Sequence, residues 1–287
     1  MFWQTTRFRI DLTMPRVMGI VNVTPDSFYD GDPLLDAGQA IARCERLVRE
    51  GADLLDIGGE STRPGAAPLP LALELARVMP VLERALHLGV PVSIDTRTPE
   101  VMRAALALGV DIVNDIDALR NDAALDVVAA HANCGVCLMH MQGEPGVMQQ
   151  RPEYGDVVAE VAAYLREREV ALRKRGIDAT RIVLDPGIGF GKTPAHNLEL
   201  LRRQRELVVI GRPLLVGWSR KSTLGVVTGR PVGERLAASI AAALAAVERG
   251  ACIVRVHDVA ATVDALAVWR AADLGPRIIA PALEPSR

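Results

Sequence analysis

The stretch Arg181–Lys192, with the sequence RIVLDPGIGFGK, indicates how this chain is built. Its first part, Ile182-Val183-Leu184, is apolar, rich in β-branched residues and of strand length. Asp185 follows directly, and Pro186 then opens a glycine-rich loop whose backbone can approach a ligand closely. Thr193-Pro194 is typical of the N-cap and first residue of a helix. The stretch therefore predicts a strand that delivers a carboxylate into a loop ahead of a helix.

Two nucleotide-binding interpretations of this loop fail on spacing. A P-loop requires a glycine where the chain has Pro186. A dinucleotide fingerprint requires its third glycine where the chain has Lys192. From this stretch alone, a plain strand-to-helix turn with an incidental aspartate remains an open alternative.

The same order of elements recurs along the chain. Apolar segments of strand length, each followed by a helical segment, are predicted at 17–23, 54–57, 92–94, 111–113, 136–139, 182–184, 213–218 and 252–256. Strands that alternate with helices favour parallel crossovers. Eight such units in a chain of 287 residues predict a closed (β/α)8 TIM barrel of the α/β class. An open doubly wound sheet is the alternative, but no dinucleotide fingerprint supports it.

We expect residues 1–287 to form this one barrel domain, with a short strand at 8–12 before it and an irregular tail at 276–287. Most helices are expected to end at a glycine turn. One helix is expected from Thr193 to about Glu206, and an alanine-rich helix is expected over Val232–Arg249.

Composition narrows the class of protein. Apolar residues make up 49% of the chain, and the net charge of −2 offers no electrostatic reason for a nucleic-acid or anionic-membrane partner. No apolar run approaches the length of a membrane span, and the N-terminus has no apolar stretch of signal-peptide length. We therefore expect a cytoplasmic protein with no membrane partner.

The four cysteines include one C-x-x-C pair, Cys134 and Cys137. A redox pair should open a helix, whereas Cys137 lies inside the apolar run Gly135–Met139. No second C-x-x-C completes a zinc site. We expect both cysteines to be small buried hydrophobic residues.

Polar residues gather where strands run into helices. In a barrel these joints all lie at the carboxyl ends of the strands, where barrel active sites are found. The set comprises Asn22, Thr62, Arg63, Asp95, Asn114, His140, Asp185, Lys221, Arg255 and His257. A helix cap could explain any one of them, and is the preferred interpretation of Asp115 and Thr98. It does not explain Lys221 and Arg255, which are poor caps at a helix start.

These residues suit two kinds of ligand. A carboxylate accepts two parallel N–H groups of the kind that an amino-pyrimidinone ring offers. The residues suited to such a polar ring are Asp95, Asn114, Asp185 and Lys221. A planar guanidinium stacks on rings or binds phosphate, and the residues suited to an anion are Asn22, Thr62, Arg63, Arg255 and His257. Mg²⁺ that arrives with substrate phosphates needs few protein ligands, so Asn22 alone could suffice. The chain has no H-E-x-x-H, no cysteine–histidine cluster and no G-x-S-x-G.

Eight stretches together resemble the dihydropteroate synthase family, the folate-pathway target of sulfonamides. They span nearly the whole predicted barrel in the family's order: MGIVNVTPDSF (18–28), DIGGESTRPGA (56–66), SIDT (93–96), VNDI (113–116), LMHMQGEP (138–145), LDPGIGFGKT (184–193), VGWSRKS (216–222) and RVHDV (255–259). The resemblance implies a transferase that joins 6-hydroxymethyl-7,8-dihydropterin diphosphate to p-aminobenzoate and releases diphosphate, with Mg²⁺ as cofactor.

The resemblance also implies roles for individual residues. The pterin site would comprise Asp95, Asn114, Ile116, Met139, Asp185, Lys221 and Arg255. The p-aminobenzoate site would comprise Phe28, Thr62, Arg63, Pro64, Phe190, Ser219 and Lys221. The diphosphate site would comprise Asn22, Thr62, Arg63, Arg255 and His257, with Asn22 on the metal. The residues closest to the chemistry would be Asn22, Arg63, Asp95, Lys221 and Arg255.

Two alternatives share the barrel, namely a pterin-binding methyltransferase and a non-catalytic pterin-binding paralogue. The STRPG and SRKS stretches favour the synthase over the first, and the presence of Asn22, Arg63 and Lys221 argues against the second. The chain departs from the family's usual pattern at Tyr29 and Asp32, and in the apolar segment 66–75. The family implies a homodimer, for which the alanine-rich helix is a candidate surface, although burial within the monomer would explain that helix equally well.

Overall fold

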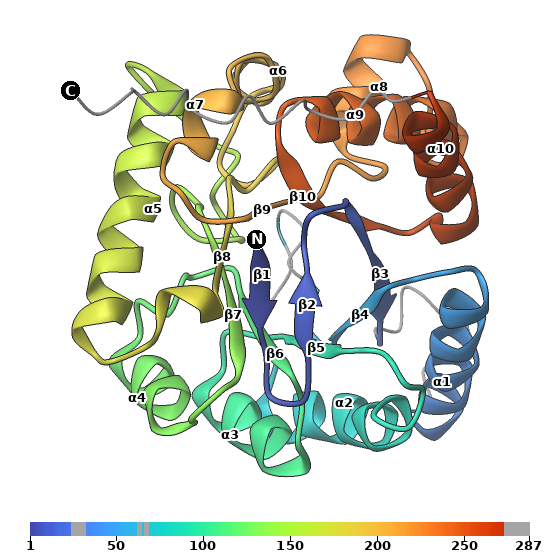
Figure 1. The fold of residues 1–287 in the computed structure, drawn as a ribbon, viewed down its shortest axis with the longest axis vertical. Coiled ribbons are helices and arrows are strands. Elements are labelled where there is room, and N and C mark those ends of the chain that lie inside the picture. The colour runs from blue at the N-terminus through green and yellow to red at the C-terminus, as the bar shows by residue number, and fades with distance from the viewer. Residues whose placement is uncertain (24–32, 62–64, 66–68, 273–287) are drawn as a thin grey trace, which may run out of the picture.

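The computed structural model describes residues 1–23, 33–61, 65 and 69–272. Eight parallel strands close into a barrel in the order β10-β3-β4-β5-β6-β7-β8-β9 (Figure 1). They are β3 (Arg16–Asn22), β4 (Leu54–Gly58), β5 (Val92–Asp95), β6 (Ile112–Asp115), β7 (Gly135–Met139), β8 (Ile182–Asp185), β9 (Leu214–Val216) and β10 (Ala251–Val256). The predicted (β/α)8 barrel is confirmed.

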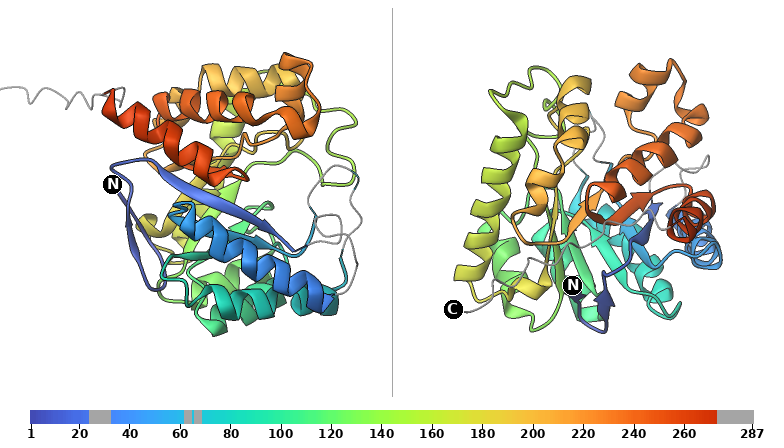
Figure 2. Two further views of the ribbon diagram at one scale, coloured as in Figure 1. Left: turned by 90° about the vertical axis from the view of Figure 1, so that its right-hand side faces the viewer. Right: turned by 45° about the horizontal axis from the view of Figure 1, so that its top comes forward.

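Helices surround the barrel and connect its strands (Figures 1 and 2). They are α1 (Pro33–Arg49), α2 (Leu71–Ala85), α3 (Pro99–Leu108), α4 (Asp122–Ala130), α5 (Val157–Lys174), α6 (Pro194–Arg202), α7 (Arg205–Val208), α8 (Ser222–Thr228), α9 (Leu236–Glu248) and α10 (Val259–Ala271). Short 3-10 turns, η2 (Ala179–Arg181) and η3 (Val232–Glu234), precede β8 and α9. In the part of the chain that the structure describes, none of these helices is long and apolar enough to cross a bilayer.

Some helix boundaries differ from those predicted from the sequence. The helix expected from Thr193 to about Glu206 is divided into α6 and α7, and the alanine-rich helix starts only at Leu236, after η3. The short helix α8 was not expected. The N-cap at Thr193 is confirmed, because its hydroxyl accepts the His196 backbone N–H at 3.2 Å. The expected tail, 276–287, lies outside the described residues.

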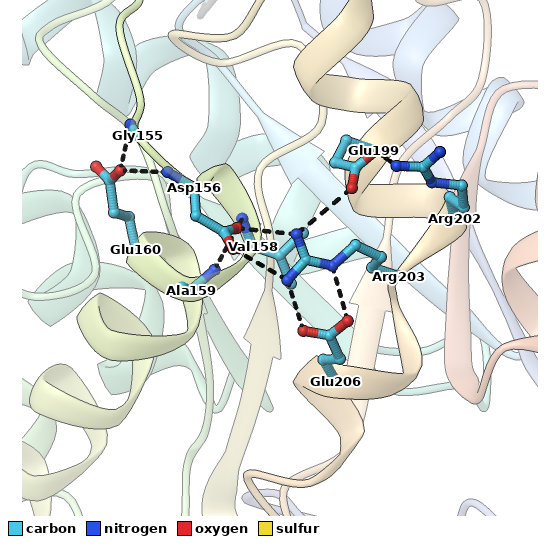
Figure 3. Close-up of polar contacts among 9 residues, drawn as sticks. All are labelled: Gly155, Asp156, Val158, Ala159, Glu160, Glu199, Arg202, Arg203 and Glu206. Atoms are coloured by element: carbon cyan, nitrogen blue, oxygen red, sulfur yellow. Dashed lines mark hydrogen bonds and ion pairs between the residues drawn. The ribbon is translucent and has the colours of Figure 1, made fainter.

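Arg203 marks the junction between α6 and α7 (Figure 3). Its guanidinium donates to Glu206 on α7 at 2.7 and 2.8 Å and to Asp156 at 3.1 Å. Asp156 is also the N-cap of α5, where it accepts the backbone N–H groups of Val158 and Ala159. This one side chain therefore joins the start of α5 to the break between α6 and α7.

An antiparallel hairpin of β1 (Phe2–Gln4) and β2 (Arg9–Asp11) lies across the amino end of the barrel (Figures 1 and 2). Only the second of these strands was predicted. Trp3 is fully buried, and its indole N–H donates to the Arg181 carbonyl at 2.8 Å. Gly135 leaves room for this ring, since a Cβ atom there would lie 2.9 Å from the Trp3 nitrogen. The hairpin thus closes the end of the barrel opposite the site.

Side chains fill the barrel in two levels, because alternate residues of each strand point inward. The lower level packs against the hairpin and is almost wholly apolar: Met18, Leu54, Ser93, Ile112, Cys137, Val183, Leu215 and Ile253. The upper level lies two residues further along each strand and is mostly polar or charged: Ile20, Asp56, Asp95, Asn114, Met139, Asp185, Gly217 and Arg255. Along each strand, the inward-facing residues therefore change from the apolar core to the functional site within one repeat of the pleat.

Candidate active site

A cavity of about 1300 Å³ opens at the carboxyl ends of the strands. Eleven of the predicted site residues line it: Asn22, Asp95, Asn114, Ile116, Met139, Asp185, Phe190, Ser219, Lys221, Arg255 and His257. Four others, Phe28, Thr62, Arg63 and Pro64, lie outside the described residues, as do Tyr29, Asp32 and residues 66–68. Of the predicted site residues that the structure describes, His140 alone does not line this cavity.

Arg255 is held by two carboxylates at the centre of the upper level. Its Nε donates to Asp56 at 2.5 Å, and its Nη2 donates to Asp95 at 2.6 Å. The Asn114 amide also donates to Asp56, at 3.0 Å. Gly58 leaves space for this group, because a Cβ atom there would lie 3.2 Å from that of Asp95. Four strands therefore position one charged cluster.

Asp185 and Lys221 form the opposite side of the cavity. Asp185 accepts the Gly187 backbone N–H at 2.7 Å, which leaves its other oxygen for a ligand. The Lys221 ammonium lies 4.3 Å from the centre of the Phe190 ring, within range of a cation–π contact. Gly189, at a φ of +82°, passes close beneath the Lys221 stem.

The segment before Lys221 is strained. Arg220 has a φ of +59°, which is uncommon for a residue with a side chain. Its backbone N–H donates to Ser239 at 2.9 Å, and its guanidinium donates to Asp258 at 2.6 and 3.1 Å. These contacts on both sides of the residue hold a backbone conformation that directs Lys221 into the cavity.

Ser219 and His257 close the side of the cavity nearest α10. The Ser219 hydroxyl lies 3.0 Å from the His257 Nδ1 and accepts the His257 backbone N–H at 3.2 Å. Arg43 on α1 donates to the His257 carbonyl at 3.0 Å and to the Ile20 carbonyl at 3.1 Å. The imidazole therefore sits in a fixed position among several guanidinium groups.

Burial shifts the protonation of these groups. It raises the pKa of Asp95 to about 7, where Arg255 opposes the shift and Asp56 reinforces it. It also lowers the pKa of Lys221 to about 8, with Arg255 adding to the effect and Asp185 opposing it. Burial and the surrounding arginines lower the pKa of His257 to about 3, so its imidazole is neutral at pH 7. Such shifts are typical of functional sites.

The described residues contain no cluster of three or more histidines, cysteines or acidic residues that could hold a metal ion by themselves. Asn22 lines the cavity at the end of β3 and offers one amide oxygen. The residues present therefore fit a hard cation only if substrate oxygens supply most of its ligands.

The cysteines take no part in the site. Cys134 and Cys137 are both fully buried and unpaired as disulfides, and burial raises the pKa of both thiols. Their predicted role as small hydrophobic residues is confirmed.

Asp115, which was interpreted as a local cap, accepts the backbone N–H groups of Asp117 and Leu119 at 2.8 Å. Thr98 is the N-cap of α3 by position, but its hydroxyl donates to Glu74 instead.

Comparisons with known proteins agree on one family. The model of the pterin binding enzyme family matches residues 18–257. The dihydropteroate synthase of Neisseria meningitidis serogroup B is 54% identical over 275 residues, covering 94% of this chain and 96% of the relative. The chain belongs to the dihydropteroate synthase family.

Solved structures of dihydropteroate synthases share the fold. The Burkholderia cenocepacia enzyme, complexed with 7,8-dihydropteroate, has a TM-score of 0.87 and 53% identity, covering 95% of this chain and 96% of its own. The Yersinia pestis enzyme, in a sulfonamide drug complex, has a TM-score of 0.90 and 42% identity, covering 95% and 99%. The predicted family and transferase class are confirmed, and these matches favour a dihydropteroate synthase over the pterin-binding methyltransferase.

Asp56 is a member of the Arg255 cluster that sequence reasoning missed. It is fully buried and binds both Arg255 and Asn114, yet one of its oxygens has no hydrogen-bond partner. Most predicted site residues lie at or just after the ends of the predicted strands, whereas Asp56 lies in the middle of β4. A carboxylate alternating with Leu54 in an apolar strand was the signal, because a buried charge needs a partner.

His140 was expected among the residues that meet at the strand ends, but it contacts Tyr164 and Lys192 instead. It is 6% exposed, and its ring packs edge-on against Tyr164 at 4.9 Å. Its Nδ1 lies 2.9 Å from the Lys192 ammonium. This pair lies beside the site rather than in it.

Proposed function

We propose that the upper level of the barrel holds the dihydropterin ring of 6-hydroxymethyl-7,8-dihydropterin diphosphate. Asp185 would accept two adjacent N–H groups of the amino-pyrimidinone edge, and Asn114 would bind the same ring from β6. Lys221 would donate to the ring carbonyl or a ring nitrogen, while Ile116 and Met139 would contact its faces. The observation that carries this proposal is the convergence of a free carboxylate oxygen, an amide and an ammonium in one cavity.

Arg255 and its neighbours would bind the diphosphate. A guanidinium suits phosphate oxygens, and His257 and Asn22 lie on the same cavity wall. Thr62 and Arg63 would complete this half, by their resemblance to the family's motif. The neutral His257 imidazole can donate one N–H to a phosphate oxygen without requiring a proton from solvent.

We further propose that carbon–oxygen cleavage precedes attack by the amine. The electron-rich dihydropterin would stabilise a cation at its methylene carbon as the bonding electrons leave with diphosphate, and the Asp95 carboxylate in the same cavity would favour that charge. The lone pair of the p-aminobenzoate nitrogen then forms the new carbon–nitrogen bond. The proton that nitrogen releases can pass to diphosphate, so the site needs no strong base.

Asn22 would provide the one protein oxygen to a Mg²⁺ ion whose remaining ligands are phosphate oxygens and water. When bound, this ion would supply charge neutralisation to the leaving diphosphate. The role of the protein would be to orient the diphosphate through Arg255 and His257.

The p-aminobenzoate ring would pack against Phe190, near Ser219 and Lys221. The Lys221 ammonium would attract its carboxylate, and residues Phe28, Thr62, Arg63 and Pro64 would complete this pocket, as the family motif implies. Sulfonamides would compete for the same space, consistent with the sulfonamide complex of the Yersinia pestis enzyme.

The assay that tests this function is diphosphate release from the pterin diphosphate, with and without p-aminobenzoate, in Mg²⁺ and after chelation. We expect release that depends on both p-aminobenzoate and Mg²⁺. Release without the amine would indicate a hydrolase, and binding without release would indicate a pterin-binding protein. Full activity after chelation would remove the metal from the proposal.

We also propose a homodimer whose surface includes the start of the alanine-rich segment 232–249 rather than its alanine face. Most of the apolar face of α9, including Ala242 and Ala246, is buried within the protomer. Exposed apolar side chains instead occur close together in the chain at Val226, Val227, Val232 and Leu236. We expect sedimentation to give a dimer that Val226→Glu with Val227→Glu converts to monomers; an unchanged dimer would exclude this surface.

A cytoplasmic location of the protein remains a prediction.

A further inference from the structure

Lys192 is a buried charged residue for which the proposed chemistry has no use. It is 2% exposed, and it lies in the loop between β8 and α6, which also carries Phe190. Burial lowers the pKa of its ammonium, and Asp185 opposes that shift. A lysine is seldom buried so completely unless its charge is compensated by nearby acceptors.

The Lys192 ammonium is enclosed by backbone carbonyls. It donates to the carbonyls of Gly187 and Phe190 at 3.0 Å each and to that of His140 at 3.2 Å. The His140 Nδ1 lies 2.9 Å away and completes the enclosure. Two of these carbonyls belong to the β8–α6 loop, and the third follows β7. One cation therefore joins the two segments that flank the cavity on this side.

The glycines of the loop allow this close approach. At Gly187, with a φ of +68°, a Cβ atom would lie 1.9 Å from the His140 carbonyl oxygen. At Gly191, with a φ of +58°, it would lie 2.4 Å from the Gln142 carbonyl oxygen. The backbones of the two segments thus approach one another closely, and the Lys192 ammonium donates to carbonyls of both.

The joined segments carry the apolar wall of the cavity. Phe190 packs with Ile116, Met139 and Met148 in one cluster, and its ring faces the Lys221 ammonium. Gln149 donates to the Gly189 carbonyl at 2.6 Å from the outer side of the loop. Movement of the loop would therefore move the Phe190 ring relative to Lys221, whereas Asp185 and Asn114 are held by strands.

We propose that Lys192 is a positioning residue for p-aminobenzoate: its ammonium, enclosed by the carbonyls of His140, Gly187 and Phe190, fixes the β8–α6 loop so that Phe190 faces Lys221. This inference rests on the proposed assignment of Phe190 and Lys221 to the p-aminobenzoate pocket. It gives Lys192 no contact with either substrate.

The test compares Lys192→Met with Lys174→Met, which makes the same change at an exposed site on α5. We expect Lys192→Met to raise the KM for p-aminobenzoate at least tenfold while the Kd for the pterin diphosphate changes less than threefold. Lys174→Met should match the wild type in both. Equal changes in the two constants, or an unchanged KM, would overturn the proposal.

Two further variants separate positioning from a general loss of stability. Leu82→Ala removes a fully buried side chain from α2, away from this loop, and should lower the melting temperature without raising the KM. In a Phe190→Ala background, Lys192→Met should change the KM less than twofold, because the residue it positions is absent. A full tenfold effect in that background would show that Lys192 does not act through Phe190.

If Lys192→Met fails to fold, Gln149→Leu tests the same loop from its exposed side. We then expect the KM for p-aminobenzoate to rise about threefold, again with little change in pterin affinity. An unchanged KM in this variant would overturn the proposal. A failure of the proposed function is distinguished by the wild-type protein, which would then show no p-aminobenzoate-dependent release of diphosphate.

Discussion

The two levels of the barrel interior differ in chemistry although only two residues separate them on each strand. In β6, Ile112 belongs to the buried apolar cluster, and Asn114 lines the cavity. In β10, Ile253 packs below Arg255 in the same way. The hairpin covers the lower level with Trp3, whereas the upper level faces the cavity. The comparison indicates that stability and ligand binding reside in adjacent, separable layers of one set of strands.

The largest expected effect comes from Arg255, an upper-level residue whose loss should affect both stability and activity. Arg255→Met would leave Asp56 and Asp95 without their shared cation, and removal of one partner from a buried ion pair costs about 3–5 kcal/mol of unfolding free energy. Chemical denaturation should show this loss together with loss of activity. Additional Asp56→Asn and Asp95→Asn changes should restore part of the stability but no activity. Wild-type stability in the single variant would mean that the cluster is not buried as described.

The next effect should be confined to the lower level. Ile112→Ala removes a fully buried side chain, which costs about 3 kcal/mol of unfolding free energy through lost burial and the remaining cavity. The Kd for the pterin diphosphate should stay within twofold of the wild type. Asn114→Ala, on the same strand, should show the reverse pattern. A large change in Kd for Ile112→Ala would indicate that the two levels are coupled.

The positions of the barrel strands could be predicted from the sequence because each strand is a short, mostly apolar run, and several of these runs end in a polar residue. Asn22, Asn114 and Asp185 were found by that rule, and all three line the cavity. Asp56 was not, because it lies in the middle of β4, two residues before that strand ends. Its partner is Arg255, from the far end of the chain, and only the closed barrel brings the two together.

Local pattern also failed where tertiary contacts set the boundaries. The break between α6 and α7 coincides with Arg203, whose partners include Asp156, the N-cap of α5. The strand β1 has three residues and pairs with β2, so it offers little periodicity of its own. The contacts of Lys192 could not be predicted for another reason. Its partners include three backbone carbonyls, which every residue type carries, so the amino-acid sequence does not indicate them.

A smaller effect is expected from pH. Burial lowers the pKa of Lys221 to about 8, so the free enzyme loses this charge as the pH rises above 8. We expect kcat/KM to fall about tenfold per pH unit above that value, because the neutral amine no longer attracts p-aminobenzoate. Lys221→Arg should have lower activity with a flat alkaline limb, since a guanidinium keeps its proton. A wild-type profile that is flat to pH 10 would contradict this assignment.

The smallest effect is expected at the cysteines. Cys137 belongs to the lower level and Cys134 lies just before β7, and both thiols are buried. Cys134→Ser with Cys137→Ala should leave kcat/KM per folded molecule within twofold of the wild type and insensitive to dithiothreitol. Loss of turnover in well-folded protein would assign these residues to the site after all.

Calorimetric titration of the pterin diphosphate into wild-type protein and Asp185→Asn tests most directly whether the upper level is the pterin site. The amide of the variant accepts one N–H group and presents a donor to the other, so the lost charge-assisted contact should cost about 2–3 kcal/mol. The account predicts a Kd weakened about fiftyfold in a variant that unfolds at the wild-type denaturant concentration. Wild-type affinity in Asp185→Asn would contradict it and remove this carboxylate from the site.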